Sequence, residues 1–339
     1  MTRQQKLMLA LGAGAAAMLA ARRGLRNRHA ISFEGRVVII TGGSRGLGLV
    51  LARQLAAEGA RLCLLARDSE ELDRARAQLP HDAEVMTIRC DIRRRADVRF
   101  AMDRVLSRWT AVDVLINNAG VIQVGPLEHM TITDFESAMA THFWGPLHLM
   151  FECVPSMRRR GFGRIVNVSS IGGRIAVPHL APYCASKFAL AGLSDSVRAE
   201  LDQYGIRVTT VAPGLMRTGS PLNADFKGQH QLEYTWFAIS DSIPGLTISA
   251  ERAARKIIEA CRYGDPELTI TLPAKIAVRV NHAAPGSVAR AMAVANRVLP
   301  GPGGAEGDRQ RRGRNSQSKW TESFATVLTD RAAMANNEI

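Results

Sequence analysis

Seven short apolar segments, separated by segments of helical periodicity, constrain the fold more than any other feature of the chain. They span residues 36–41, 61–66, 84–89, 112–116, 164–168, 207–212 and 267–271. Their wealth of Val, Ile and Leu is typical of strands that are buried on both faces of a sheet. Strands that alternate with helices form parallel βαβ units with right-handed crossovers. The sequence therefore predicts an α/β fold, a doubly wound parallel sheet of about seven strands in a three-layer α/β/α sandwich.

The same patterns divide the chain into four parts. Residues 1–30 form an apolar and basic N-terminal segment, residues 31–272 the α/β domain, and residues 273–299 a helical extension. Residues 300–339 are predicted to be a flexible basic linker and tail with a short docked helix, because residues 300–319 are rich in Gly, Pro and Arg. Inside the domain, residues 214–247 show no regular pattern. We expect them to form a structureless lid or substrate loop.

The N-terminal segment contains an uninterrupted apolar run over residues 7–21. As a helix the run would extend about 22 Å, at about 1.5 Å per residue, which is short of a hydrocarbon core of about 30 Å. It can be interpreted as a marginal membrane anchor, a secretory signal or an arm on a surface. The arginine cluster that follows it resists translocation. We therefore favour membrane association through residues 7–21 with the main domain in the cytoplasm, over a disordered Ala-rich leader.

The composition is strongly basic, since 44 Lys and Arg against 31 Asp and Glu give a formal charge of +13. This charge alone does not distinguish a nucleic acid, a membrane surface and an anionic cofactor as partners. Only 6 cations are lysines, so 44 − 6 = 38 are arginines, and a lysine within a motif is informative. The 5 cysteines form no CxxC pair. They favour packing roles in a reducing compartment and predict neither a disulfide framework nor a metal site.

A glycine-rich segment, TGGSRGLG at residues 41–48, directly follows the first predicted strand. The GxxxGxG pattern is weak by itself, but here it joins a buried strand to the start of a helix. Backbone N–H groups at such a helix N-terminus bind a pyrophosphate, and the glycines allow the turn and the close approach. We predict a dinucleotide site that includes Gly42, Ser44, Arg45, Gly46, Leu47 and Gly48.

The end of the second strand favours NADP over NAD. An acidic residue there would bind the adenosine ribose of NAD, but the chain has Ala66 and Arg67. Arg67 and Arg45 together suit a 2′-phosphate through forked, charge-assisted hydrogen bonds. The simpler interpretation is that both are ordinary surface arginines. Asp68 is adjacent, and an inward-turned Asp68 would weaken the preference for NADP.

Tyr183 is the only one of 4 tyrosines with a lysine four residues later, Lys187. Residues i and i+4 share one face of a helix, and an ammonium near a phenol lowers the phenol pKa towards the range of a general acid/base. Ser170 ends the preceding strand, at the sheet edge where ligands bind in open α/β folds. A serine there can hydrogen-bond a substrate oxygen beside the tyrosine.

Six ordered motifs make residues 33–271 resemble the short-chain dehydrogenase/reductase family. They are TGGSRGLG (41–48), CDI (90–92), NNAG (117–120), NVSS (167–170), YCASK (183–187) and APG (212–214). The resemblance implies a Rossmann-like fold and hydride transfer between NAD(P)(H) and an alcohol/carbonyl pair. Homo-oligomers are common in such families.

The resemblance also implies roles for individual residues. Tyr183 would be the acid/base, Lys187 would bind the nicotinamide ribose and lower the tyrosine pKa, and Ser170 would orient the carbonyl. The further cofactor contacts that it implies are Asp91, Ile92, Asn117, Asn118, Ala119, Gly120, Pro213, Gly214 and Thr218.

His142 departs from the family pattern, because it stands where the family places a catalytic asparagine, in the segment THFWG at residues 141–145. The family role depends largely on the backbone carbonyl, which holds a water near the lysine, so a histidine is compatible with activity. A modified proton relay and a tolerated packing residue remain the two interpretations.

We therefore expect an NADP-dependent oxidoreductase that interconverts a secondary alcohol and a carbonyl. The apolar N-terminal run favours a lipophilic substrate, and so do apolar residues of the lid: Leu215, Met216, Leu222, Phe226, Trp236 and Phe237. The alternative is a cofactor-binding regulatory or scaffold protein that has lost catalysis. A nucleic-acid-binding protein would explain the charge but not the ordered motifs, and no nucleic-acid partner is expected.

Overall fold

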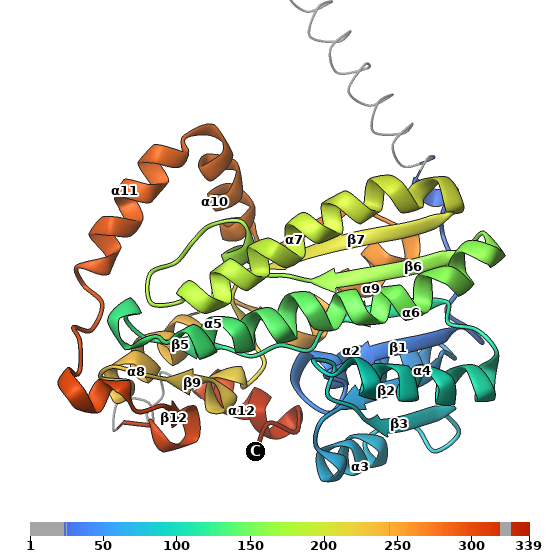
Figure 1. Ribbon diagram of the computed structural model, residues 1–339, viewed down its shortest axis with the longest axis horizontal. Coiled ribbons are helices and arrows are strands. Elements are labelled where there is room, and N and C mark those ends of the chain that lie inside the picture. The colour runs from blue at the N-terminus through green and yellow to red at the C-terminus, as the bar shows by residue number, and fades with distance from the viewer. Residues whose placement is uncertain (1–23, 25, 244, 319–326) are drawn as a thin grey trace, which may run out of the picture.

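The computed structural model describes residues 24, 26–243, 245–318 and 327–339. A 7-stranded sheet forms its centre (Figure 1). The strands are β1 (Val37–Thr41), β2 (Arg61–Ala66), β3 (Val85–Arg89), β4 (Val114–Asn117), β6 (Gly163–Val168), β7 (Ile206–Pro213) and β11 (Glu267–Ile270). Their order is β11-β7-β6-β4-β1-β2-β3 and every pair is parallel. The predicted doubly wound sheet is confirmed.

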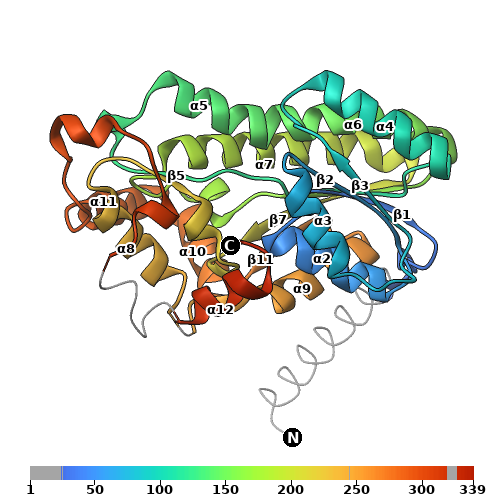
Figure 2. The ribbon, with the colours of Figure 1, turned by 90° about the horizontal axis from the view of Figure 1, so that it is seen from below.

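Helices cover both faces of this sheet. They are α2 (Gly46–Ala57), α3 (Ser69–Ala77), α4 (Arg95–Trp109), α5 (Ile132–Met139), α6 (Gly145–Arg160), α7 (Ala181–Leu201) and α9 (Ala250–Tyr263). Figure 2 shows α4 to α7 on one side and α2, α3 and α9 on the other. Leu51 and Ile257 pack in the core on the α2 side, and Met102 and Leu149 in the core on the α4 side. The three-layer sandwich is therefore confirmed as well.

The long helix predicted near residues 133–159 is interrupted. Between α5 and α6 the chain makes a π-helical turn, Ala140–Trp144. Such turns are frequent at functional sites. His142 lies within this turn and is fully buried, so the irregular backbone coincides with the residue that departs from the family pattern.

Residues 214–247 are not structureless, contrary to the expectation from the sequence. They contain β8 (Met216–Arg217), β9 (Asp225–Phe226) and α8 (His230–Ser240). β8 pairs with β10 (Ile248–Ser249) and β9 with β5 (Gln123–Val124). Phe226, Tyr234 and Phe237 share a hydrophobic cluster with Val124 of β5. The segment is ordered by a strand about a hundred residues away in the chain, which local periodicity does not reveal.

Within residues 300–339 the predicted short helix is present at Val327–Ala335, and the described part of the predicted linker contains regular structure that the sequence did not indicate. After a hairpin of α10 (Leu272–Ala283) and α11 (Pro285–Asn296), β12 (Arg311–Arg312) pairs antiparallel with β9. The helix α12 (Val327–Ala335) follows, and it lies near α2 in Figure 2. Backbone pairing and buried polar side chains such as Ser316, which is 0% exposed, order a segment that has few apolar residues.

Among the described residues, no helix combines the length and the apolar character that crossing a membrane requires. The apolar run of residues 7–21, on which the predicted membrane association depends, lies outside the described residues. Cys63, Cys90, Cys153, Cys184 and Cys261 are all buried free thiols, as the packing interpretation expects.

Candidate active site

The predicted site residues gather at one edge of the sheet, where the parallel strands end. Gly42 follows β1, Arg67 follows β2, Asp91 lies beyond β3, Asn118 follows β4 and Ser170 lies beyond β6. The strand order reverses direction between β1 and β4, and open α/β sheets bind ligands beyond the carboxyl ends of the strands at such a switch point. The structure thus brings together residues from five separate segments of the chain.

Glycines shape the loop between β1 and α2. Gly42 and Gly46 have φ angles of +62° and +53°, which favour glycine. A Cβ at Gly48 would overlap the carbonyl oxygen of Gly42. The loop is tied to β4 because Thr41 Oγ1 accepts a hydrogen bond from the Asn118 N–H at 2.9 Å. This arrangement presents the N-terminus of α2 at the sheet edge, where it suits an anion.

The three predicted catalytic side chains share one site. Lys187 Nζ lies 5.7 Å from the centre of the Tyr183 ring and donates to the Val168 carbonyl at 2.9 Å. The Ser170 hydroxyl hydrogen-bonds Tyr183 and accepts from the Gly172 N–H at 3.0 Å. A substrate oxygen placed between Ser170 and Tyr183 would meet two hydroxyl groups.

The pKa values of this group differ from the expectation based on the sequence. Burial raises the pKa of Tyr183 to about 12, although the Ser170 hydroxyl opposes the rise, and burial lowers the pKa of Lys187 to about 7. The predicted lowering of the tyrosine pKa by Lys187 is not found, because desolvation dominates and the ammonium donates to a backbone carbonyl. Tyr183 is therefore protonated near neutral pH and can donate a proton to an oxygen.

His142 uses both ring nitrogens in hydrogen bonds. The Val121 N–H donates to Nε2 at 3.1 Å, so Nδ1 carries the proton and donates to Ser186 Oγ at 2.7 Å. Ser186 in turn donates to the Tyr183 backbone carbonyl at 2.8 Å. Burial, with a smaller contribution from Lys187, holds the pKa of His142 well below its usual value. The neutral imidazole is a bridge to α7, which favours the packing interpretation.

The remaining predicted cofactor residues lie at the same edge. Asn117 Nδ2 donates to Asn167 Oδ1 at 2.8 Å, which ties β4 to β6. The Asp91 carboxylate pairs with the Arg93 guanidinium at 2.6 Å. The other residues lie at or beyond the carboxyl ends of β1, β3, β4, β7 and β8: Leu47, Ile92, Ala119, Gly120, Pro213, Gly214 and Thr218.

Acidic side chains bind Ser44 and Arg45, two residues of the glycine-rich loop near the predicted 2′-phosphate position. Arg45 pairs with Glu71 at 3.2 Å and with Glu338 at 3.5 Å. Asp68 caps α3, since its Oδ1 accepts from the Glu71 N–H at 3.0 Å. It is therefore engaged by its own helix rather than turned towards the loop. Ser44 Oγ donates to the Glu71 carboxylate at 2.9 Å.

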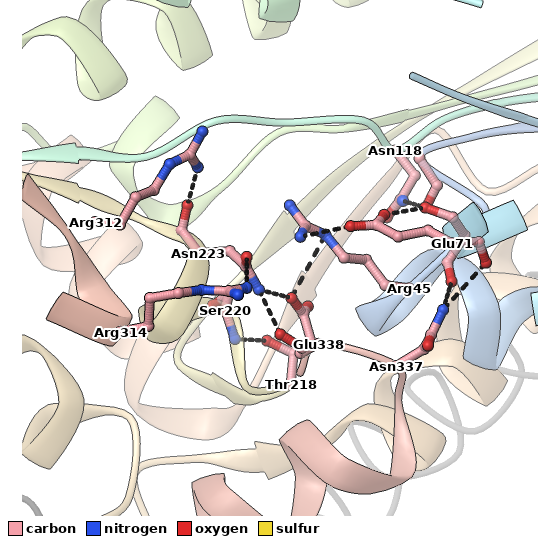
Figure 3. A network of polar contacts seen from close by, with 12 residues as sticks. Arg45, Glu71, Asn118, Thr218, Ser220, Asn223, Arg312, Arg314, Asn337 and Glu338 are labelled. Carbon is pink, nitrogen blue, oxygen red and sulfur yellow. Dashed lines mark hydrogen bonds and ion pairs between the residues drawn. The ribbon is translucent and has the colours of Figure 1, made fainter. Parts of the chain in front are cut away.

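Sequence reasoning missed the end of the chain, which reaches this site. Glu338 is 6% exposed, and its carboxylate accepts from Asn223 Nδ2 at 2.7 Å (Figure 3). Asn337 Nδ2 donates to the carbonyl of Ser44, 293 positions earlier, at 2.8 Å. No local pattern in the sequence signals contacts over such a separation. Asp241, a buried carboxyl group beyond α8 that adds to the rise in the Tyr183 pKa, was missed for the same reason.

Comparisons with known proteins agree with this geometry. Residues 36–226 match the short chain dehydrogenase family. The chain is 36% identical over 230 residues to dehydrogenase/reductase SDR family member 7B of Danio rerio, which covers 63% of this chain and 74% of that protein.

Two solved structures extend the similarity to cofactor complexes. A metagenomic short-chain oxidoreductase in complex with NADP has 28% identity and a TM-score of 0.58, over 71% of this chain and 97% of that one. The 3-ketoacyl-(acyl-carrier-protein) reductase from Brucella melitensis, complexed with NADH, has 25% identity and a TM-score of 0.62, over 71% and 98%. The chain belongs to the short-chain dehydrogenase/reductase family of NAD(P)-binding oxidoreductases.

Proposed function

We propose that the protein is an NADP-dependent oxidoreductase that interconverts a secondary alcohol and a carbonyl, with Tyr183 as the general acid/base. The main support for this function is that Ser170, Tyr183 and Lys187 lie together at the sheet edge that also holds the glycine-rich loop. In the direction of reduction, Ser170 holds the carbonyl oxygen and Tyr183 donates its proton to that oxygen. The hydride for the carbonyl carbon comes from bound NADPH.

The described residues fit a dinucleotide. The positive φ angles of Gly42 and Gly46 bring the start of α2 to the sheet edge, where its N–H groups suit a pyrophosphate, and the gap beside Gly46 holds the Glu338 carboxylate in this structure. At the adenosine end, partial burial and the neighbouring arginines Arg93, Arg45 and Arg312 lower the pKa of the Arg67 guanidinium. A 2′-phosphate would relieve this crowding of positive charge, which is why we favour NADP.

Arg67→Ala tests the choice of cofactor. We expect the KM for NADPH to rise about 30-fold, the equivalent of one or two charge-assisted hydrogen bonds, while the KM for NADH stays within about twofold. Initial rates with each cofactor and one carbonyl substrate measure the difference. Arg104→Ala, at an exposed position of α4, is the matched control and should change neither constant. Equal rises in both constants for Arg67→Ala would contradict the assignment.

His142→Asn tests the role of the buried imidazole. Because both ring nitrogens are bonded and the pKa is far below its usual value, we expect the pH–rate profile to keep its shape across the neutral range. The free energy of unfolding should instead fall by about 1 kcal/mol, because the variant loses one hydrogen bond. Rates as a function of pH and urea denaturation measure the two effects. A profile displaced by about one pH unit would show a proton relay.

We also propose that the substrate is lipophilic, and a cavity supports this better than the lid does. Phe226 and Phe237 are buried in the cluster around Tyr234, so they pack within the lid. A separate cavity of about 780 Å³ reaches Cys184, the residue that follows Tyr183 in α7. Its lining is mainly apolar and includes Ile175, Val177, Phe188, Val288 and Met292.

The alternative function, cofactor binding without turnover, predicts a different outcome in one experiment. Purified protein is mixed with NADPH and a panel of ketones and aldehydes of increasing chain length. The proposed function requires NADPH consumption that improves with the apolar length of the substrate. Binding of NADPH without consumption across the whole panel would favour a regulatory or scaffold protein.

A further inference from the structure

We infer that residues 336–338, here called the tail segment, are an internal competitor of the dinucleotide: they occupy the anion-binding start of α2 and leave it when the cofactor binds. The inference rests on the proposed function, because it concerns the same glycine-rich loop. The tail segment contacts the loop through the Asn336 carbonyl and through the side chains of Asn337 and Glu338.

The tail segment uses the donor and the space that a pyrophosphate needs. The Gly46 N–H, at the start of α2, donates to the Asn336 carbonyl at 2.8 Å. Glu338 Oε1 lies 2.5 Å from the position that a Cβ at residue 46 would take. A carboxylate therefore fills the gap that this glycine leaves beside the helix N-terminus. Helix N-termini bind carboxylates and phosphates by the same dipole and the same N–H groups, so the two ligands exclude one another here.

The cations and amides around the Glu338 carboxylate are suited to a phosphate as well. Arg45 and Asn223 approach the carboxylate from two sides (Figure 3), at 3.5 Å and 2.7 Å. Arg312 and Arg314 hold Asn223 in turn, through its carbonyl at 3.0 Å and its side-chain oxygen at 3.1 Å. Release of the tail segment would free the Nε group of Arg45 for an incoming anion, while its Nη1 group stays paired with Glu71.

Specific contacts define the docked position of the tail segment. Asn337 has a φ of +59°, a left-handed conformation that asparagine tolerates, and its side chain donates to the carbonyls of Ser44 and Glu71 at 2.8 and 3.1 Å. Arg74 donates to Asn337 Oδ1 at 3.0 Å. The side chain thus spans the loop before α2 and the first turn of α3.

Two features show that docking carries a cost, so a better anion can displace the tail segment. Asn336 Nδ2 is buried without a hydrogen-bond partner among the described residues, and such a donor loses its hydration without compensation. Burial also raises the pKa of Glu338 to about 7, against the opposing effect of Arg45. Both penalties disappear when the segment returns to water.

Docking of the tail segment should raise the apparent Kd for NADPH by a factor set by the docked population. A protein whose binding-competent state is only a fraction f of the population binds with an apparent Kd raised by 1/f. With the tail segment docked in most molecules, we expect its removal to tighten NADPH binding by about tenfold or more. A segment that merely covered a bound cofactor would have the opposite effect.

The experiment compares NADPH binding by the full chain and by a chain that ends at Ala335, through the fluorescence of NADPH itself. The shortened chain should bind about tenfold more tightly, and Glu338→Ala in the full-length chain should shift the Kd in the same direction by a smaller factor. Ile339→Ala in the full-length chain, at a side chain that is 65% exposed, is the matched control and should leave the Kd unchanged. An unchanged or weaker Kd in the shortened chain overturns the inference and leaves the proposed function standing.

Hydrogen exchange of the full chain gives a second readout that needs no variant. The Glu338 N–H donates to the Ala333 carbonyl at 3.0 Å, so the docked segment should exchange slowly. Saturation with NADPH should accelerate exchange at residues 336–338. Slower exchange on NADPH addition would overturn the inference, because the segment would then close over the cofactor. Failure of both chains to bind NADPH would remove the proposed function together with the inference.

Discussion

Replacing Tyr183 by phenylalanine is expected to lower kcat for carbonyl reduction by about 10³-fold, the usual scale of general acid catalysis. The phenol hydroxyl, hydrogen-bonded to Ser170, is the proton donor in the proposed reaction, and phenylalanine lacks it. NADPH affinity should stay within about threefold, because the ring keeps its edge contact with His142, 5.5 Å between centres. Single-turnover consumption of NADPH and a fluorescence titration measure the two constants.

Tyr204→Phe is the matched control for this experiment. Tyr204 lies beyond the other end of α7, where the Arg158 guanidinium stacks on its ring at 4.0 Å, and its hydroxyl has no part in the proposed reaction. Activity of Tyr183→Phe within about tenfold of the unchanged protein would be below the usual scale of acid catalysis and would assign the proton transfer to another group. Loss of NADPH binding in the same variant would instead indicate damage to the site.

Gly48→Ala is expected to destabilise the protein by about 3 kcal/mol, at the upper end of the usual cost of overpacking. A methyl group at this position would overlap the Gly42 carbonyl and approach Asn118 Nδ2 to 2.7 Å. Both neighbours are held in place, the first by the turn after β1 and the second by its hydrogen bond to the Thr41 carbonyl at 3.0 Å. Urea denaturation followed by circular dichroism gives the change in unfolding free energy.

Gly192→Ala provides the comparison for Gly48→Ala. Gly192 lies in α7 with no atom within 4 Å of an added Cβ, so alanine should stabilise the helix by about 1 kcal/mol. The same substitution should thus lower the free energy of unfolding at residue 48 and raise it at residue 192. A neutral effect of Gly48→Ala would mean that the loop relaxes, and the tight turn would then not explain why glycine is needed there.

The sequence predicts the central sheet well because its strands carry a local signal. Residues 61–66 were predicted as a strand, and β2 spans Arg61–Ala66 in the structure, since strands buried on both faces are continuous apolar runs. The right-handed crossover rule limits the possible strand orders to a few, and the order itself comes from the structure. Ser170, Tyr183 and Lys187 were identifiable because each has a fixed relation to a strand end or a helix turn.

Other features depend on contacts that no local pattern contains. The helix α8 is stabilised through Phe226 and Val124, and the tail segment through Ser44 and Asn223. The pKa of Tyr183 was predicted to be lowered but is raised. A neighbouring charge can be predicted from residue spacing, whereas the extent of burial cannot. The π-helical turn at His142 is joined to α7 by the hydrogen bond from His142 to Ser186, a contact that the local sequence does not indicate.

Strand β9 of the small sheet β12-β9-β5 lies close in sequence to a contact of the tail segment and also belongs to the lid. Asn223, which holds Glu338, lies two residues before β9, and Phe226 of β9 belongs to the apolar cluster of the lid. A substrate that contacts the lid and a cofactor that releases the tail segment would therefore act on one short stretch of backbone. Linkage requires that each change the affinity of the other by the same factor.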